Sequence, residues 1–209
     1  FTRRNEVSLP RNKSSASARV GDTTSVEYSV YIASNPSFSN LAIYDDFYHF
    51  GQFHGSGDED VPYMLGITPS QYFPAPSGSS VARHGDLAFF IRSTIFPDIL
   101  EDHGARYAIM LARRGDFEDR WHRVRFEITW AEDRTGSAAF YFNNRQVFRC
   151  ESCVTAPIHD MTAIMDGRRV SQGFYFKYGI YNWRRGSSRA TAEPPTVVAY
   201  YRDLSWSNR

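Results

Sequence analysis

The sequence predicts an all-β protein made of two packed antiparallel sheets, and three observations predict it. Apolar and polar residues alternate with a period of two in about ten short segments, which is the pattern of half-buried strands. No segment keeps a helical period for three full turns. Loops rich in Gly, Pro and Ser separate the segments. Short strands without helices between them indicate a β-jelly roll or a related sandwich.

The first clear strand is Ser25 to Ile32, in which Val26, Tyr28, Val30 and Ile32 alternate with the other residues. Later segments follow the same rule. We expect strands at Tyr48–His54, Tyr63–Ile67, Leu87–Ser93, Arg106–Ala112, Arg123–Trp130, Ser137–Phe142, Gln146–Arg149, Gly173–Tyr181 and Thr196–Trp206. The best helical candidates, Asn40–Asp46 and Ala156–Met165, are short, and we expect them to be peripheral.

Two features support antiparallel pairing with one wet face. In the strand that starts at Arg123, the apolar residues fall on one face, whereas Arg123 and Arg125 fall on the other, so these arginines should be solvated. Further along, Asn143 and Asn144 separate two strand-like segments. Because Asn tolerates positive φ, this pair predicts a tight hairpin turn.

Length and composition fit one globular domain over residues 1–209. The chain has 42% hydrophobic and 22% charged residues, which suits a substantial core. Its longest apolar run, Leu87 to Ile91, is far shorter than the roughly 20 residues of a membrane-spanning helix. The net charge of +1 argues against a general nucleic-acid or anionic-membrane binder. We expect a monomer with neither kind of partner.

The only cysteines, Cys150 and Cys153, follow the predicted hairpin. Their spacing is compatible with a local disulfide in an exported protein, with two free thiols, or with a metal ligand pair. The chain begins with Phe1 instead of Met, which suggests processing or trimming. We therefore expect a secreted or periplasmic protein whose signal peptide has been removed.

The segment Tyr175 to Tyr181 carries the first candidate site residues. Alternation puts Tyr175, Lys177 and Tyr181 on one face of a strand. Gly179 has no side chain between Lys177 and Tyr181, so a sugar ring could lie there. Lys177 is also the only lysine after residue 13. The alternative interpretation of the same segment is ordinary sheet packing without a functional role.

Two other motifs share this spacing. Gln52 and His54 lie side by side with Phe53 on the opposite face. Arg4 and Glu6 are aligned in the same way, and Glu6 could hold the guanidinium of Arg4 through a bidentate pair. A lone histidine on a strand is more often structural, so only the motifs together indicate a site.

Together these residues suggest β-elimination next to a carboxylate. Removing a proton α to a carboxylate pushes charge onto a group that is already negative, so cations or amides must neutralise it. Arg4, Gln52 and Lys177 can do so. A base and an acid must flank the carbon and the leaving oxygen, and His54 and Tyr181 can fill these roles.

The order Arg-x-Glu, Gln-x-His and Tyr-Phe-Lys-x-Gly-x-Tyr resembles the β-jelly-roll polysaccharide lyases, which include alginate lyases, glucuronan lyases and the heparin lyase I group. The segment from Trp121 through Asn144 and the final strand around Tyr200 resemble the heparin lyase I and glucuronan lyase side of that set. The resemblance implies a concave sheet that holds an acidic polysaccharide. It also implies a catalytic set of Gln52, His54, Lys177 and Tyr181, with Arg4, Glu6, Arg92 and Tyr175 as substrate-binding candidates.

Departures from these families narrow the expected substrate. Alginate lyases usually carry a second Arg where this chain has Ser8. The chain is also much smaller than heparin lyase I and lacks a Lys-rich surface, which argues against a highly sulfated substrate. We therefore expect cleavage of a glucuronan-like polymer.

Two other functions and one metal site stay open. A non-catalytic glycan-binding module on the same sandwich would use Tyr and Trp platforms without chemistry. A glycoside hydrolase needs two carboxylates flanking the scissile bond, and no strand shows closely spaced inward acids. We expect no required cofactor and no catalytic metal. The acidic runs Asp45-Asp46 and Asp58-Glu59-Asp60 leave a structural calcium site open.

Overall fold

The computed structural model describes residues 3–9, 18–34, 46–55, 61–69, 73–76, 78–92, 106–156, 162–165, 168–171, 173–184 and 197–209. Within these ranges it describes the backbone but not the side chains at 3–6, 8–9, 46–47, 55, 92, 106, 162–165, 168–171 and 182–184. All regular structure in the described part is β.

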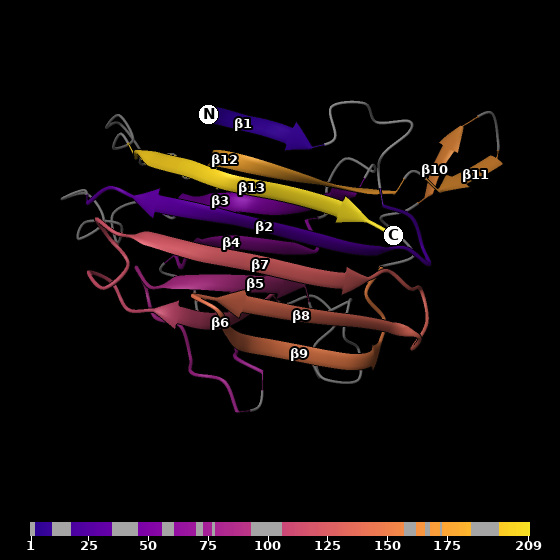
Figure 1. Cartoon of the computed structure of the whole chain (residues 1–209), viewed down its shortest axis with the longest axis horizontal. Coiled ribbons are helices and arrows are strands. Elements are labelled where there is room, and N and C mark those ends of the chain that lie inside the picture. The colour runs from indigo at the N-terminus through magenta and orange to yellow at the C-terminus, as the bar shows by residue number, and fades with distance from the viewer. Residues whose placement is uncertain are drawn as a thin grey trace.

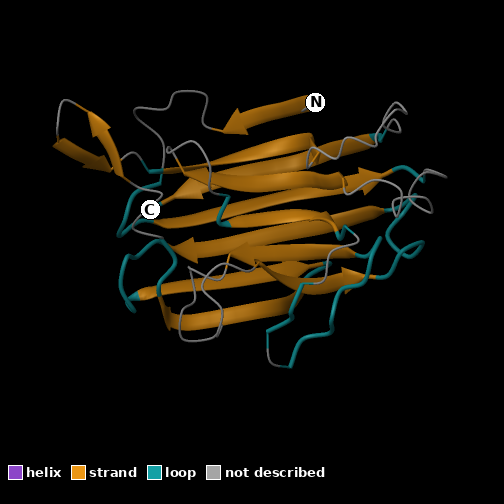
Figure 2. Ribbon diagram, turned by 180° about the vertical axis from the view of Figure 1, so that it is seen from behind, coloured by secondary structure: helices purple, strands orange, loops and turns teal. Residues whose placement is uncertain are grey.

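The strands form two antiparallel sheets that lie face to face (Figure 1). Figure 2 shows the same molecule from behind, with the larger sheet toward the viewer. The six-stranded sheet has the order β1 (Arg3–Leu9), β12 (Phe174–Arg184), β3 (Asp46–Gly55), β4 (Tyr63–Ile67), β5 (Leu87–Arg92) and β6 (Arg106–Ala112). The five-stranded sheet has the order β13 (Ala199–Asn208), β2 (Thr23–Ile32), β7 (Trp121–Thr129), β8 (Gly136–Phe142) and β9 (Arg145–Cys153). A small hairpin of β10 (Thr162–Met165) and β11 (Arg168–Ser171) stands apart.

The core lies between the two sheets and draws on both. Trp130, which follows β7, is fully buried and stacks on Phe174 of β12 with ring centroids 3.8 Å apart. Its indole N–H donates to Thr24 Oγ1 over 2.8 Å, and the Thr24 hydroxyl donates to Asn208 Oδ1 over 2.9 Å. The polar end of this large side chain is therefore satisfied without solvent.

The predicted strands are confirmed, with small differences at their ends. The Arg4–Glu6 motif lies in β1, as its alternation suggested. The helix expected at Ala156–Met165 is wrong, because residues 162–165 form β10. The sequence Asp166-Gly167 between β10 and β11 favours a two-residue hairpin, which explains the error. The other expected helix, Asn40–Asp46, lies outside the described residues except for Asp46, which begins β3. No helix in the described part is long and apolar enough to cross a membrane.

The hairpin between β8 and β9 turns at the two asparagines, as expected. Asn143 and Asn144 have φ values of 50° and 64°, and Phe142 pairs with Arg145 across the turn. The charged face of β7 is also as expected, with Arg123 exposed and bonded to Glu27 of β2.

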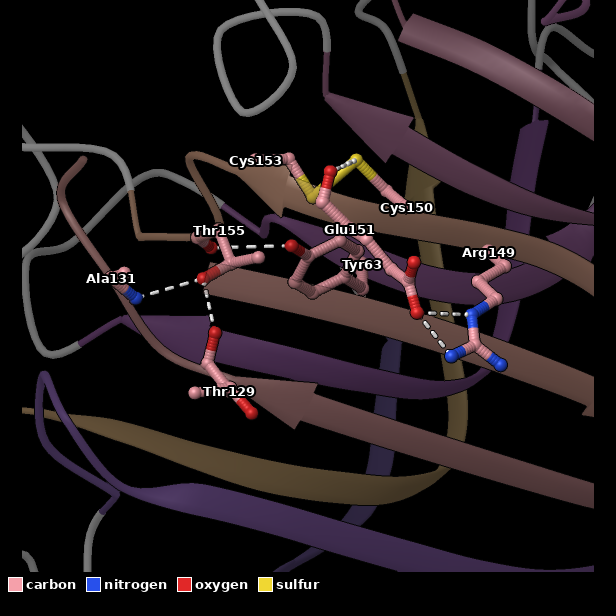
Figure 3. The surroundings of a disulfide bond; sticks show 8 residues. All are labelled: Tyr63, Thr129, Ala131, Arg149, Cys150, Glu151, Cys153 and Thr155. Atoms are coloured by element: carbon pink, nitrogen blue, oxygen red, sulfur yellow. Dashed lines mark hydrogen bonds and ion pairs between the residues drawn. A yellow bond between two sulfur atoms is a disulfide. The ribbon is translucent and has the colours of Figure 1, made fainter. Parts of the chain in front are cut away.

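Cys150 and Cys153 form a disulfide at the end of β9 (Figure 3). The chain that follows is tied to both sheets through Thr155. The Thr155 hydroxyl donates to the Thr129 carbonyl over 2.6 Å and accepts from the Ala131 N–H over 2.8 Å. The Tyr63 hydroxyl of β4 donates to the Thr155 carbonyl over 3.2 Å. These bonds fix where the five-stranded sheet meets the six-stranded one.

The register of β3 slips between His49 and Gly51, where β3 has one more residue than β4. As a result, Tyr48, Phe50 and Phe53 all belong to the core, although their spacing does not fit simple alternation. An extra residue of this kind is a β-bulge. The bulge turns His49 and Gln52 to the same face, although they are three residues apart.

A second apolar cluster covers the outer face of the six-stranded sheet at strands β4, β5 and β6. Met64 of β4, Phe90 of β5 and Ala108 of β6 point away from the main core, and Phe73 and Ala82 pack over them. The segment that contains Phe73 and Ala82 therefore covers the β4–β6 side and leaves polar residues on the β1, β12 and β3 side.

Candidate active site

A strip of polar and aromatic side chains lies on the outer face of the six-stranded sheet. Phe53, Phe174 and Phe176 belong to the core between the sheets, so their chain neighbours point the other way. This outward set consists of His49, Gln52 and His54 on β3 and Tyr175, Lys177 and Tyr181 on β12. We call these six residues the polar strip.

Gln52 and Lys177 occupy the centre of the polar strip. They are paired across β3 and β12, so their Cα atoms lie directly opposite each other. Both are buried, with 1% and 8% of their surfaces exposed. An ammonium group and an amide N–H₂ at neighbouring positions can both donate to one carboxylate.

His54 and Tyr175 form the next pair along the strip. They are Cα partners, and their rings stack with centroids 5.6 Å apart. The Lys177 Nζ lies 5.3 Å from the centroid of the Tyr175 ring, which is within cation–π range. Tyr175 therefore links the predicted base to the predicted cation.

Tyr181 lies at the other end of the strip, beside His49. The two residues are Cα partners, and their ring centroids are 5.4 Å apart. His49 Nδ1 is 3.2 Å from Gln52 Oε1. His49 thus connects Tyr181 to the central pair.

The first motif of the sequence lies on β1, next to these residues. Arg4 is the Cα partner of Tyr181, Glu6 is the partner of Gly179, and Ser8 is the partner of Lys177. Cross-strand partners share a face of a sheet, so positions 4 and 6 lie on the face of the polar strip. The ion pair predicted between Arg4 and Glu6 lies outside the described side chains.

Arg92 is separated from this group. It ends β5, and β3 and β4 lie between β5 and β12. At about 4.8 Å per strand, its backbone is about 14 Å from β12. The apolar side chains of Met64 and Phe90 occupy the face in between. The structure therefore does not bring position 92 next to the central pair.

His54 and Tyr181, the predicted base and acid, share a face but pair with different partners. Across β3, His54 and His49, the Cα partner of Tyr181, are five residues apart. The register shifts at His49/Gly51 and at Tyr178/Tyr181 shorten this stretch further, so the two positions lie less than about 17 Å of strand apart. Gln52 and Lys177 lie between them. The arrangement places the paired Gln52 and Lys177 in the middle of the strip and an imidazole or phenol ring toward each end.

His49 is the residue that the sequence reading missed. Counting by twos from His54 places His49 on the core side. The signal that could have found it is the change of phase between Tyr48-x-Phe50 and Phe53, with Gly51 in between, since a glycine at a phase change marks a bulge.

The expected absence of a catalytic metal and the open question of a structural calcium site both stay predictions. Among the described residues, no three His, Cys, Asp or Glu side chains gather into a cluster that could hold a metal ion. The acidic runs considered for calcium, Asp45-Asp46 and Asp58-Glu59-Asp60, lie outside the described side chains.

Comparison with known proteins identifies the family. The sequence profile described as "Polysaccharide lyase" matches residues 2–205, which is nearly the whole chain. The chain belongs to this polysaccharide lyase family. No curated protein sequence matches it.

Solved structures show the same fold in other lyases. An endo-β-1,4-glucuronan lyase from Trichoderma reesei is 15% identical, with a TM-score of 0.55 over 99% of this chain and 74% of that one. A family 7 alginate lyase, A1-II', in complex with product is 14% identical, with a TM-score of 0.57 over 100% of this chain and 73% of that one. At these identities the likeness establishes the β-jelly-roll fold of this polysaccharide lyase.

The described side chains of the polar strip differ in chemistry from the site of a glycoside hydrolase. Hydrolases of the usual type place two carboxylates around the scissile bond. The polar strip has amide, ammonium, imidazole and phenol groups, and none of its six described side chains is a carboxylate.

Proposed function

We propose that the protein cleaves a uronic-acid polysaccharide, with glucuronan as its best substrate, by β-elimination at the polar strip. The observation that carries the proposal is the pairing of Lys177 with Gln52 between His54 and Tyr181. A polymer of uronic acids presents one carboxylate per unit next to an acidic C–H bond, which is the chemistry that this set of groups suits.

Lys177 and Gln52 neutralise the carboxylate in this proposal. When the C5 proton leaves, negative charge moves onto the carboxylate and creates an enolate-like centre. Preorganised donors stabilise that charge most where little water competes, and both residues are buried. Arg4 adds a further positive charge from β1.

His54 and Tyr181 transfer the protons. His54 accepts the proton from C5, and the electrons of that bond form the C4=C5 double bond. The C4–O4 bond breaks, and O4 takes the proton of the Tyr181 hydroxyl. The products are a free hydroxyl end and an unsaturated uronate end. Glu6, Tyr175 and Arg92 belong to the binding surface, with Arg92 at its far side.

Two features support glucuronan over alginate or heparin. Ser8 stands where alginate lyases usually carry an arginine, and it pairs with Lys177, next to the central pair. The chain has only two lysines, which suits a polymer with one negative charge per unit better than a sulfated one.

The proposal includes a secreted or periplasmic, monomeric enzyme that needs no cofactor. The Cys150–Cys153 disulfide supports an exported protein, because disulfides persist in oxidising compartments.

The deciding experiment is a substrate screen. Purified protein is incubated with glucuronan, alginate, pectate, hyaluronan and heparan, and the ultraviolet absorbance of unsaturated uronate is followed. We expect the fastest rise with glucuronan. Tyr181→Phe should lower kcat far more than it raises KM, because it removes the proton donor and leaves most of the binding surface intact.

The roles of the two rings are separated by a second variant. Loss of turnover in both His54→Ala and Tyr181→Phe supports a base and an acid on different residues. Loss only in Tyr181→Phe means that Tyr181 performs both transfers. Binding of a polyuronate by the wild-type protein without any new absorbance would replace the proposal by a glycan-binding module.

A further inference from the structure

His49 lies on the face of the polar strip only because of the bulge in β3. The register slip between His49 and Gly51 brings Tyr48 and Phe50 into the core and turns His49 outward. The residue is 5% exposed, so it is buried like its neighbours Gln52 and Lys177.

Gly66 on β4 makes space for this ring. It is the Cα partner of His49, and a Cβ atom built on it would lie 3.3 Å from His49 Cδ2 and 2.5 Å from the Tyr48 carbonyl oxygen. On the other side, Tyr181 of β12 contacts the ring. The imidazole is therefore held between two strands.

In the contact between His49 and Gln52, the histidine must be the hydrogen-bond donor. Its Nδ1 lies 3.2 Å from Gln52 Oε1. An amide oxygen only accepts hydrogen bonds, so the contact requires the proton on Nδ1. Because the Gln52 oxygen faces His49, the N–H₂ group of the same amide points away from His49. An N–H₂ group attracts a carboxylate, whereas an amide oxygen repels it.

We propose that His49 is a positioning residue that fixes the orientation of the Gln52 amide, so that this amide presents its N–H₂ group to the substrate carboxylate. The role rests on the proposed lyase function, since Gln52 is the group through which His49 acts. The second contact of the ring, with Tyr181, places the acid and the amide against one rigid support.

The experiment compares two variants of nearly equal shape. In His49→Asn, the side-chain N–H₂ can take the place of the Nδ1–H donor, whereas His49→Leu has no donor. Both remove the ring and its contact with Tyr181, so the difference between them isolates the bond to Gln52. We expect kcat/KM of His49→Leu on glucuronan to be at least about tenfold lower than that of His49→Asn, which corresponds to one hydrogen bond.

A structural role of the ring alone would not depend on Gln52, and a third variant tests this point. In a Gln52→Leu background, the difference between Asn and Leu at position 49 should disappear, because the group that responds to it is gone. Equal activity of the two His49 variants, or a difference that persists in the Gln52→Leu background, would overturn the proposal.

A readout without substrate separates this inference from the proposed function. Nitrogen-15 NMR of the imidazole should report the Nδ1–H tautomer of His49 in the wild-type protein. The Nε2–H tautomer would overturn the inference even in an active enzyme. Absence of turnover on every polyuronate, together with the Nδ1–H tautomer, would refute the lyase proposal and still support the bond from His49 to Gln52.

Discussion

Lys177 combines two properties that rarely occur together in this chain. It is the only lysine after residue 13, and it is buried beside Gln52 and near the ring of Tyr175. A buried ammonium costs desolvation energy, which an anionic substrate can offset. The position therefore suits a cation that meets a carboxylate.

Replacing Lys177 by Ala should weaken transition-state stabilisation by about 2.7–4 kcal/mol, which is about 100- to 1,000-fold in kcat. Arg should rescue only part of the loss, because its planar fork presents donors differently from a compact ammonium. Steady-state kinetics on glucuronan check this. Arg202→Ala, in β13 of the other sheet, is the control and should keep wild-type kinetics. Full activity of Lys177→Ala would place this residue outside the reaction.

His122 is a buried residue whose neutral form is fixed at both nitrogens. Its Nε2–H donates to the Phe117 carbonyl over 2.9 Å, and its Nδ1 accepts from the Asn143 amide over 3.0 Å. The Asn143 oxygen accepts the Arg123 N–H, which fixes the direction of that amide. Burial lowers the pKa of His122 below its usual value near 6.5.

The lowered pKa gives the stability a pH dependence of known sign. Below about pH 6.5 the unfolded chain takes up a proton at this position that the folded protein resists, so unfolding becomes easier as the pH falls toward the folded pKa. Above about pH 6.5 the contribution is fully present. Urea unfolding between about pH 7.5 and pH 5 should show a decrease in the free energy of unfolding that His122→Gln reduces. An equal pH dependence in both proteins would contradict this assignment.

Among the elements, the turn before β5 depends on one carboxylate. Asp86 is 3% exposed and accepts bonds from the Arg83 N–H at 2.8 Å, the Arg113 guanidinium at 2.6 Å and the Arg114 N–H at 3.1 Å. Its two oxygens therefore join the Arg83–Asp86 turn to the end of β6. Ala82, just before this turn, packs over the outer face of the sheet.

Asp86→Asn should destabilise the protein by about 1–3 kcal/mol, because one end of an amide cannot accept from these donors. The exposed Asp116→Asn is the matched control and should change stability by less than about 0.5 kcal/mol. Urea unfolding at neutral pH measures both. Equal stability of the two variants would mean that the three bonds to Asp86 do not hold the turn.

The strands differ in how far alternation in the sequence predicts their structure. Alternation was sufficient to predict which residues of β2, β7 and β12 face the core, although the pairing of β12 with β3 shifts register between Tyr178 and Tyr181. It failed for β3, because a bulge costs less free energy than exposing the rings of Tyr48 and Phe50 to solvent. The bulge lets both rings pack in the core. Alternation also placed Gln52 and Lys177 on outward faces, but their pairing depends on register, which connects residues far apart in sequence.

At the scale of the whole molecule, one core joins the two sheets. Phe53 of β3 contacts Phe126 of β7, and Trp130 stacks on Phe174 of β12. Neither sheet can lose its inner face without exposing the other. The candidate site depends on this core too, since each residue of the polar strip has a chain neighbour in the core or, for Tyr181, packed against it.

We propose on this basis that residues 1–209 form one domain and unfold in a single cooperative step. Far-ultraviolet circular dichroism reports the strands, and fluorescence reports the four tryptophans, of which Trp130 is fully buried. The two transitions should coincide in urea. Separate midpoints would indicate two independently stable units.

The pairing of β12 with β1 and β3 also sets the time at which the polar strip can form. About 120 residues separate the end of β3 from the start of β12, so at about 5–20 residues per second the ribosome needs roughly 6–24 s to deliver the partner strand. During that interval β3 has an open edge with Gln52 and His54 on it, and an open edge can pair with another chain. The synthesis of β12 therefore closes the open edge of β3 and completes the candidate site in the same step. A nascent chain held by a chaperone until β12 emerges should give a higher yield of active protein than one left to fold strand by strand.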